Sequence, residues 1–290
     1  MSAAEMTPQQ QLLEQAVPRG SSLYYSVYFA PRESQPALRA LYAYQREITE
    51  ILREVRDRSV AAAKLKWWRE ELDRAFDGRP QHPVAQALAT EVLPGRTLSK
   101  EQFAQVIEGV ELDLDYGLYP SFRELSNYCH QVGGSITELA VQICGFRNPA
   151  TLRYAHDLGM ALQLATLLRN VRRDLDAGRL YIPEADMRQA GVSQADLLAH
   201  KTTPPIRQLF EMQVARIEDF FAHAFAHLPA EDRCRQRSGL ILAHLYQAQL
   251  AEMQDAGFPL LERRIHLTPL RKFWIAWRVA RRPANRKQSP

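Results

Sequence analysis

The chain has 290 residues, 46% of them hydrophobic and 24% charged, which is typical of a globular protein with a sizeable core. Residues 263–287 carry nine Lys or Arg and no Asp or Glu, so removing those nine charges from the net charge of +4 leaves −5 for the rest. The basic character belongs to one end of the chain, which argues against a general nucleic-acid-binding surface, and we expect no nucleic-acid partner.

Apolar residues recur at helical spacing along almost the whole chain, and no stretch shows the sustained alternation of a half-buried strand. This pattern predicts an all-α protein with a single domain over residues 1–290. The expected helices, in chain order, span residues 36–56, 60–76, 83–92, 100–116, 122–144, 149–177, 204–227, 231–256 and 269–282.

Two of these helices carry a stripe of polar residues beside the apolar one. Within each stripe the residues follow spacings of three and four, which places them on one helix face. The stripes are Tyr42, Arg46, Thr49 and Arg53 on the first expected helix, and Gln163, Thr166, Asn170 and Asp174 on the helix at 149–177. Spacing alone fits both a lined cavity and two solvent-facing surfaces.

Several short motifs surround these stripes. They are Ser-Ser-Leu-Tyr-Tyr at 21–25, Leu-Tyr-Ala-Tyr-Gln-Arg-Glu at 41–47, Lys-Leu-Lys-Trp-Trp-Arg-Glu-Glu at 64–71, Pro-Gln-His-Pro-Val at 80–84, Gly-Arg-Leu-Tyr-Ile-Pro at 178–183 and Thr-Pro-Leu-Arg-Lys-Phe-Trp at 268–274. Together they resemble the squalene/phytoene synthase family over nearly the whole chain, and most closely its bacterial hopanoid-pathway branch, the presqualene diphosphate (squalene) synthases. The resemblance implies the isoprenoid (terpenoid) synthase fold, a helical bundle around a central cavity. Active members condense two farnesyl or geranylgeranyl diphosphates using magnesium.

The metal-binding motifs that the resemblance implies are degenerate. Ionising an allylic diphosphate means stabilising a departing polyanion, which carboxylate-held divalent cations do well. Where the family has Asp-Asp-x-x-Asp, this chain has Thr49 to Arg53, and the second motif has Thr166 and Asn170 before Asp174. Of four implied ligand aspartates only Asp174 remains, and Arg53 puts a positive charge where a cation should bind. We therefore expect no cofactor.

The phosphate-holding half of the implied site remains. By resemblance, the catalytic positions are Tyr42, Tyr128, Gln163, Asp174 and Tyr181, and the diphosphate-binding positions are Arg46, Arg53, Arg169 and Arg179. A site with fewer acids and more arginines still attracts an anionic head group, without a metal bridge. The alternative is a structural network in which these arginines pair with Asp174, Asp176 and Glu50.

Other acidic and histidine residues give weaker signals. Glu47, Glu50 and Glu54 lie about 100° round the helix from the first stripe, so we expect them to point away from the cavity. Asp113 and Asp115 are two apart on a helix and face different ways, which argues against a paired carboxylate site. The eight histidines include no HExxH-type pair.

The C-terminal segment 263–290 forms a basic, aromatic helix and tail. The helix at 269–282 is too short and too charged to span a bilayer, and two interpretations are open: a peripheral membrane contact, or packing on the bundle with a solvated basic end. Glutamines and glutamates occupy residues 1–19, where a signal peptide would be basic and then apolar, and three scattered cysteines form no CxxC pair. We expect a cytoplasmic protein, in contact with the inner face of the membrane if the first interpretation holds.

Two functions follow from these observations. The first is a protein that binds a prenyl diphosphate, another anionic lipid or a protein partner with little or no catalysis. The second is an active magnesium-dependent farnesyl diphosphate condensing transferase, which would also need NADPH to form squalene. The metal ligands distinguish the two, and the loss of three aspartates favours the first.

Overall fold

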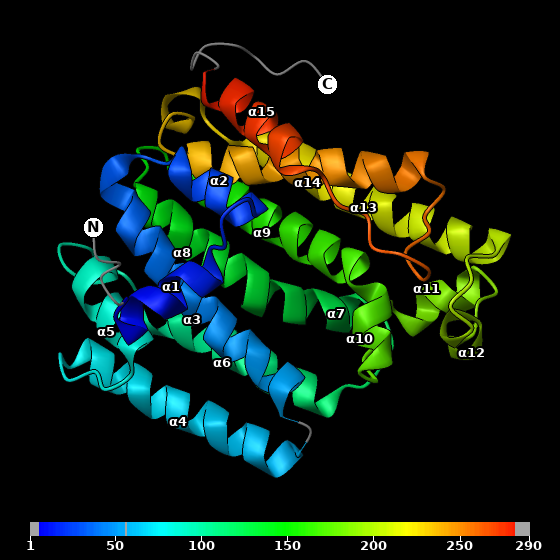
Figure 1. The fold of residues 1–290 in the computed structure, drawn as a ribbon, viewed down its shortest axis with the longest axis horizontal. Helices are drawn as coiled ribbons and strands as arrows, with labels where there is room; N and C mark the ends of the chain where they lie inside the picture. The colour runs from blue at the N-terminus through cyan, green and yellow to red at the C-terminus, as the bar shows by residue number, and fades with distance from the viewer. Residues whose placement is uncertain (1–5, 56, 282–290) are drawn as a thin grey trace.

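The computed structural model describes residues 6–55 and 57–281, which fold into a bundle of helices (Figure 1). No strand forms in this described part, and its extended segments pair only in an isolated bridge between Leu118 and Leu180. The prediction of an all-α protein is confirmed.

The helices match most of the predicted spans to within a few residues. Their bounds are α1 Pro8–Ala16, α2 Ser22–Tyr28, α3 Gln35–Glu54, α4 Arg58–Phe76, α5 Pro83–Ala87, α6 Lys100–Asp115, α7 Phe122–Cys129, α8 Ser135–Cys144, α9 Ala150–Arg169, α10 Val171–Asp176, α11 Glu184–Gln189, α12 Gln194–Leu198, α13 Pro204–His227, α14 Arg237–Asp255 and α15 Pro269–Ala280. Short 3₁₀ turns form at Arg32–Ser34 and Ala230–Asp232, and π turns form at Leu88–Val92 (η2) and His130–Gly134 (η3).

Several predicted helices are interrupted or shortened. The span 83–92 ends in the π turn η2, and α14 begins at Arg237, six residues after the predicted start at 231. The span 122–144 stays helical but contains the π turn η3 between α7 and α8. The span 149–177 breaks at Asn170, whose backbone leaves the helical region (φ −99°, ψ 6°). Asparagine bonds readily to nearby backbone and so favours the ends of helices over their interiors. α10 therefore starts as a separate short helix after α9.

Residues at the helix ends fix where the elements begin and stop. The Asp57 carboxylate accepts hydrogen bonds from the backbone N–H groups of Ser59 and Val60 and caps α4. α8 ends at Gly145, which has a φ of 73°, in the left-handed region that glycine adopts without strain. These local signals agree with the apolar periodicity, which is why most bounds are predictable.

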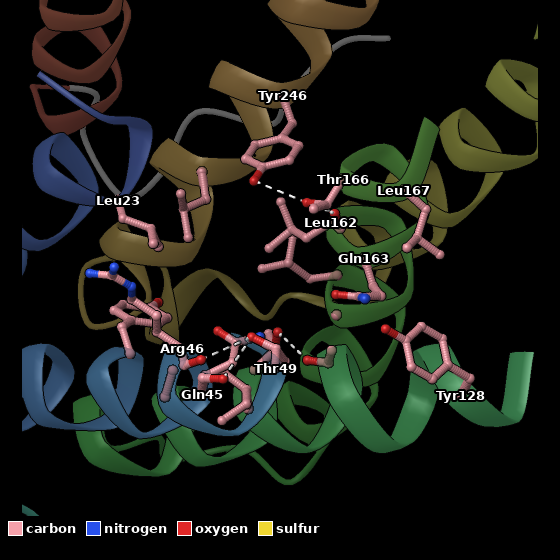
Figure 2. Close-up of a pocket in the computed structure, with 18 of the residues that line it drawn as sticks. Leu23, Gln45, Arg46, Thr49, Tyr128, Leu162, Gln163, Thr166, Leu167 and Tyr246 are labelled. Carbon is pink, nitrogen blue, oxygen red and sulfur yellow. Dashed lines mark hydrogen bonds between the residues drawn. The ribbon is translucent and has the colours of Figure 1, made fainter. Parts of the chain in front are cut away.

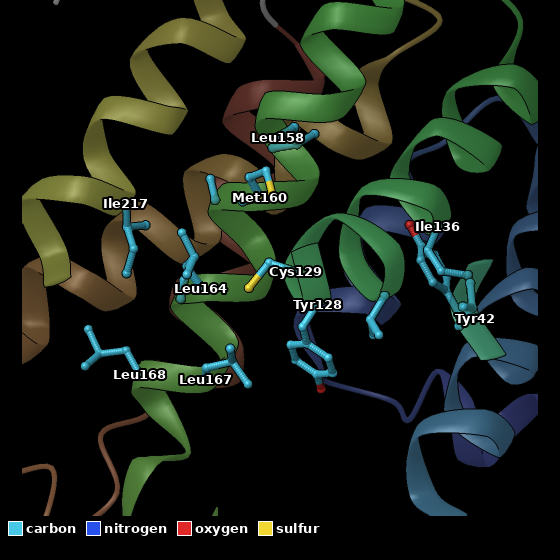
Figure 3. Close-up of a cluster of buried hydrophobic side chains, with 14 of the residues drawn as sticks. Tyr42, Tyr128, Cys129, Ile136, Leu158, Met160, Leu164, Leu167, Leu168 and Ile217 are labelled. Atoms are coloured by element: carbon cyan, nitrogen blue, oxygen red, sulfur yellow. The ribbon is translucent and has the colours of Figure 1, made fainter. Parts of the chain in front are cut away.

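Helix α9 is the centre of the bundle. It packs along α13 on one side and against η3 and α8 on another. Figure 3 shows Leu164 and Leu168 of α9 directed toward Ile217 of α13 in the buried cluster. Because α9 is buried on several sides, its sequence is apolar around most of its circumference.

Candidate functional site

A cavity of about 290 Å³ lies between α3, α8, α9 and α14. Figure 2 shows Arg46 and Thr49 of α3 on one side of it and Gln163 and Thr166 of α9 on the other. Apart from Asn170, the residues of the two polar stripes therefore line a cavity. The site residues named from the sequence that border it are Tyr42, Arg46, Thr49, Arg53, Tyr128, Gln163, Thr166, Arg169, Asp174, Arg179 and Tyr181.

Asn170 does not border the cavity, although the continuous stripe predicted that it would. The break between α9 and α10 turns its side chain aside, where it is buried and accepts a hydrogen bond at Oδ1 from Arg264 Nη2, at 3.2 Å. The side chain at this degenerate metal position of the second motif therefore bonds to the C-terminal segment and does not face the cavity.

The two threonines at degenerate metal positions bond to carbonyls of their own helices, and Thr166 also contacts a tyrosine of α14. Thr49 Oγ1 donates to the carbonyl of Gln45 at 2.9 Å, and Thr166 Oγ1 lies 2.8 Å from the carbonyl of Leu162 and 3.2 Å from the Tyr246 hydroxyl. Neither side chain adds an anionic ligand to the cavity.

Arg53 is held by a glutamate of its own helix. Its Nη1 lies 2.7 Å from Glu50 Oε1, and both residues border the cavity. The prediction that Glu50 points away from the cavity is wrong, because the i, i+3 pairing draws its side chain toward Arg53. Burial lowers the pKa of Arg53, but the charges of Glu50 and Asp174 outweigh burial and raise it overall. Glu47 lies elsewhere, with its Oε2 3.9 Å from His82 Nε2.

Asp174, the one implied ligand that remains, is also paired with arginine. Its Oδ1 accepts hydrogen bonds from Arg173 Nη2 at 3.0 Å and from Nε at 3.2 Å. Burial raises the pKa of this carboxyl, while the charges of Arg173, Arg53 and Arg179 act in the opposite direction. The carboxylate is thus enclosed by positive charge.

Asp113 is a site residue that the sequence reasoning missed. Its Oδ1 accepts from the Tyr119 hydroxyl at 2.8 Å, and its Oδ2 accepts from the Tyr181 hydroxyl at 2.6 Å and Arg179 Nη1 at 2.8 Å. Burial raises the pKa of Asp113 against the lowering effect of Tyr181 and Arg179. Asp115 does face away, as predicted. The missed signal is that Asp113 falls three residues after the buried Val110, on the apolar face of α6.

The sequence profile of squalene/phytoene synthases matches residues 17–271. The chain belongs to the squalene/phytoene synthase family. The phytoene synthase of Mycobacterium tuberculosis is 30% identical over 258 residues, covering 88% of this chain and 84% of that protein. The presqualene diphosphate synthase of Sinorhizobium fredii is 28% identical over 269 residues, covering 90% of this chain and 93% of that protein.

Solved structures of the family show the same fold. The squalene synthase of Alicyclobacillus acidocaldarius superposes with a TM-score of 0.73 at 26% identity, covering 86% of this chain and 93% of that one. A dehydrosqualene synthase superposes with a TM-score of 0.81 at 22% identity, covering 93% and 96% of the two chains. The predicted isoprenoid synthase fold is confirmed.

The carboxylates that border the cavity are all engaged with arginines. Glu50, Asp113 and Asp174 each pair with an arginine. Within residues 6–55 and 57–281, no three His, Cys, Asp or Glu side chains of the cavity come close enough to share a metal ion. The residues present do not fit a carboxylate-held magnesium cluster.

Basic residues of the C-terminal segment add positive charge near the cavity, which the sequence reasoning did not anticipate. The Arg169 guanidinium lies 5.4 Å from the centre of the Tyr246 ring, and its buried Nε has no hydrogen-bond partner. Burial, together with the charge of Arg169, lowers the pKa values of Arg264 and Lys272. Cations that depress one another's pKa values in this way favour a bound anion.

Proposed function

We propose that this family member binds a prenyl diphosphate, or another anionic lipid, in the cavity without a metal bridge and with little or no catalysis. The main observation is that four arginines and three carboxylates border the cavity. Arg53, Arg179 and Arg173 each pair with one of those carboxylates, and Arg46 and Arg169 stand outside these pairs. Arginine binds phosphate oxygens through charge-assisted hydrogen bonds and needs no metal.

The rest of the cavity wall supports a prenyl chain as the other half of the ligand. Apolar side chains from several helices complete the lining; among them are Leu23, Ile136, Leu158, Leu162 and Leu242. A pocket with a mostly apolar wall and a few convergent polar groups is typical of sites for amphipathic small molecules. Arg169 borders the cavity and has only a long contact, 3.5 Å from its Nη1 to Gln249 Oε1, so its guanidinium can take a head-group oxygen.

Incubation with farnesyl diphosphate, magnesium and NADPH is expected to give neither presqualene diphosphate nor squalene. Calorimetry in EDTA should nevertheless detect farnesyl diphosphate binding. Arg169→Met should weaken this binding by about 10- to 150-fold, the equivalent of one charge-assisted contact of about 1.5 to 3 kcal/mol. Robust turnover that EDTA abolishes would establish the alternative, a magnesium-dependent condensing enzyme, and would refute the proposal.

The proposed anionic-lipid ligand also suggests a membrane contact through α15. No helix among the described residues has the length and apolar content to cross a bilayer. The exposed fractions of Leu270, Phe273 and Trp274 are 79%, 43% and 57%. Arg278 and Arg281 follow them in the sequence. Exposed apolar side chains beside cations suit the surface of an anionic bilayer. α15 packs on α2, which contributes Leu23 to the cavity wall.

Replacing Leu270 and Trp274 together by Glu is expected to release the protein from vesicles of phosphatidylserine and phosphatidylcholine. The change removes two exposed apolar side chains and adds negative charge facing the lipid. Co-sedimentation at low and high salt measures the effect. Leu198→Glu, at an exposed apolar residue of α12, is the control. Unchanged co-sedimentation of the double variant would exclude α15 as the contact. Arg282, which the sequence analysis grouped with this helix, lies outside the described residues.

A further inference from the structure

A second cluster of polar side chains lies apart from the cavity. It consists of His130 in η3, Glu138 in α8 and His156 in α9, none of which borders the cavity. One ligand atom from each residue lies within 4.8 Å of those of the other two. The two imidazole rings are 5.0 Å apart between centroids and tilted by 52°. Three potential metal ligands thus converge from three elements.

The π turn aligns the first two of these residues. Two turns of regular α-helix span about 7.2 residues, so positions 130 and 138 would lie about 80° apart round the axis. η3 covers His130–Gly134 and closes i to i+5 hydrogen bonds, which takes up about one extra residue. Glu138 therefore returns to the face of His130, and π turns inside helices are frequent at functional sites.

Two glycines bring the third residue into place. A Cβ added at Gly134 would lie 2.8 Å from His130 Nδ1, so the imidazole can take its present position only because residue 134 has no side chain. A Cβ added at Gly159 would lie 2.6 Å from the Cα of Gly134. The backbones of η3 and α9 are therefore in contact, and His156, one turn before Gly159, is brought beside His130.

The cluster also has polar groups that no protein partner satisfies. His130 Nδ1 is buried without a hydrogen bond. Glu138 forms no ion pair within the described part of the chain, whereas the cavity carboxylates all do. Gln102 orients the carboxylate by donating from Nε2 to Glu138 Oε2 at 3.3 Å, and Gln142 holds Gln102 at 2.9 Å. Such outer contacts are typical of metal-ligating carboxylates.

We propose that His130, Glu138 and His156 bind a Zn²⁺ ion. Two imidazoles and one carboxylate are a ligand set that Zn²⁺ accepts, with a fourth position left for water because all three residues are partly exposed. Ligands at about 2.0 to 2.2 Å in tetrahedral geometry place their atoms roughly 3.3 to 3.6 Å apart. The present separations, at most 4.8 Å, would have to close to that range by side-chain rotation when the ion binds.

A bound ion would join η3 and α8 to α9. These elements contribute Gly133, Thr137 and Gln163 to the cavity wall. Zinc at this position would therefore hold two walls of the cavity together from outside, without providing a ligand to the cavity itself. This inference is independent of what the cavity binds.

Calorimetry of the untagged, chelator-treated full-length protein with Zn²⁺ alone tests the site. We expect one ion per chain and a rise in melting temperature, because only the folded chain presents the three ligands together. Glu138→Gln and His156→Ala should each weaken binding by at least about 10- to 100-fold, the loss that even an outer contact can cause. His223→Ala, an exposed histidine on α13, should leave it unchanged.

Glu138→Gln keeps the size of the side chain and guards against a folding artefact. Its melting temperature without metal should equal that of the parent, and only the zinc-induced rise should disappear. Absence of stoichiometric zinc binding in the parent would overturn the proposal. Binding by Glu138→Gln and His156→Ala at parental affinity would overturn it equally.

Discussion

Replacing Thr49 and Arg53 together by Asp is expected to abolish metal-free binding of pyrophosphate and to create magnesium-dependent binding. Both residues border the cavity on the same face of α3, one turn apart, with Asp174 on the other side. The double change removes a positive charge and adds two negative ones. Hard carboxylate oxygens on two walls then form the kind of site that magnesium takes.

The loss of pyrophosphate affinity in the absence of magnesium should be large. Arg53 provides one charge-assisted contact, worth about 1.5 to 3 kcal/mol, or about 10- to 150-fold in affinity, and two aspartates add repulsion. Glu50, freed from its pairing with Arg53, adds a further carboxylate. Asn170→Asp is left out because that side chain faces Arg264 and would pair with it.

Titration of pyrophosphate with and without magnesium measures both effects. Lys66→Asp makes a charge reversal at an exposed position on α4 and controls for the charge reversal at residue 53. Its metal-free binding should be close to that of the unmodified protein. If the unmodified protein instead needs magnesium to bind pyrophosphate, the interpretation of the α3 face is mistaken.

Features within a single helix were predictable from the sequence. Thr49 and Arg53 were placed on the cavity side of α3 because an unbroken helix fixes the direction in which each side chain leaves the backbone once one face is known. The rule does not fix the end of a long side chain, and Glu50 of the same helix turns toward Arg53 and the cavity. The same rule failed for Asn170, because the helix breaks there and the residues beyond it start a new direction. Periodicity carries no information past such a break.

Contacts between distant segments were not predictable in this way. Arg264 reaches Asn170 across 94 positions, and Arg179 reaches Asp113 across 66. The basic C-terminal segment was interpreted from its composition alone, so its contribution of Arg264 and Lys272 to the cavity region was missed. His130 and His156 were dismissed because no short motif joins them, yet a glycine contact between two elements places them together.

Two of the sequence motifs that carried the family resemblance prove to be one structural unit. Glu71, from the motif at 64–71, is fully buried, with 0% of its surface exposed. Its Oε1 accepts from the backbone N–H groups of Gln81 and His82, in the motif at 80–84, at 2.6 and 2.7 Å. Its Oε2 accepts from Arg74 Nε at 2.7 Å. The carboxylate therefore fixes the turn between α4 and α5.

Glu71→Gln is expected to lower the free energy of unfolding by about 3 kcal/mol or more at pH 7. The substitution leaves the partly buried Arg74 without its counter-charge. It also replaces one of the two carboxylate oxygens, which accept three hydrogen bonds, by an NH₂ group that cannot accept. Breaking a buried pair typically costs about 3 to 5 kcal/mol. Denaturant unfolding measures the loss. Glu70→Gln, the exposed neighbour, should change stability by less than about 1 kcal/mol.

The pH dependence separates the charge of Glu71 from its shape. Burial acts to raise the pKa of Glu71, but the hydrogen bonds from His82, Arg74 and Gln81 outweigh it and hold the pKa below its usual value. A carboxyl whose pKa is lower in the folded than in the unfolded chain stabilises the fold above its unfolded pKa of about 4.3, and this stabilisation is lost as pH falls through the folded value. The stability difference between the parent and Glu71→Gln should therefore be constant near neutral pH and shrink below about pH 4. A difference that stayed constant through this acid range would mean that Glu71 acts through its shape and not through its charge.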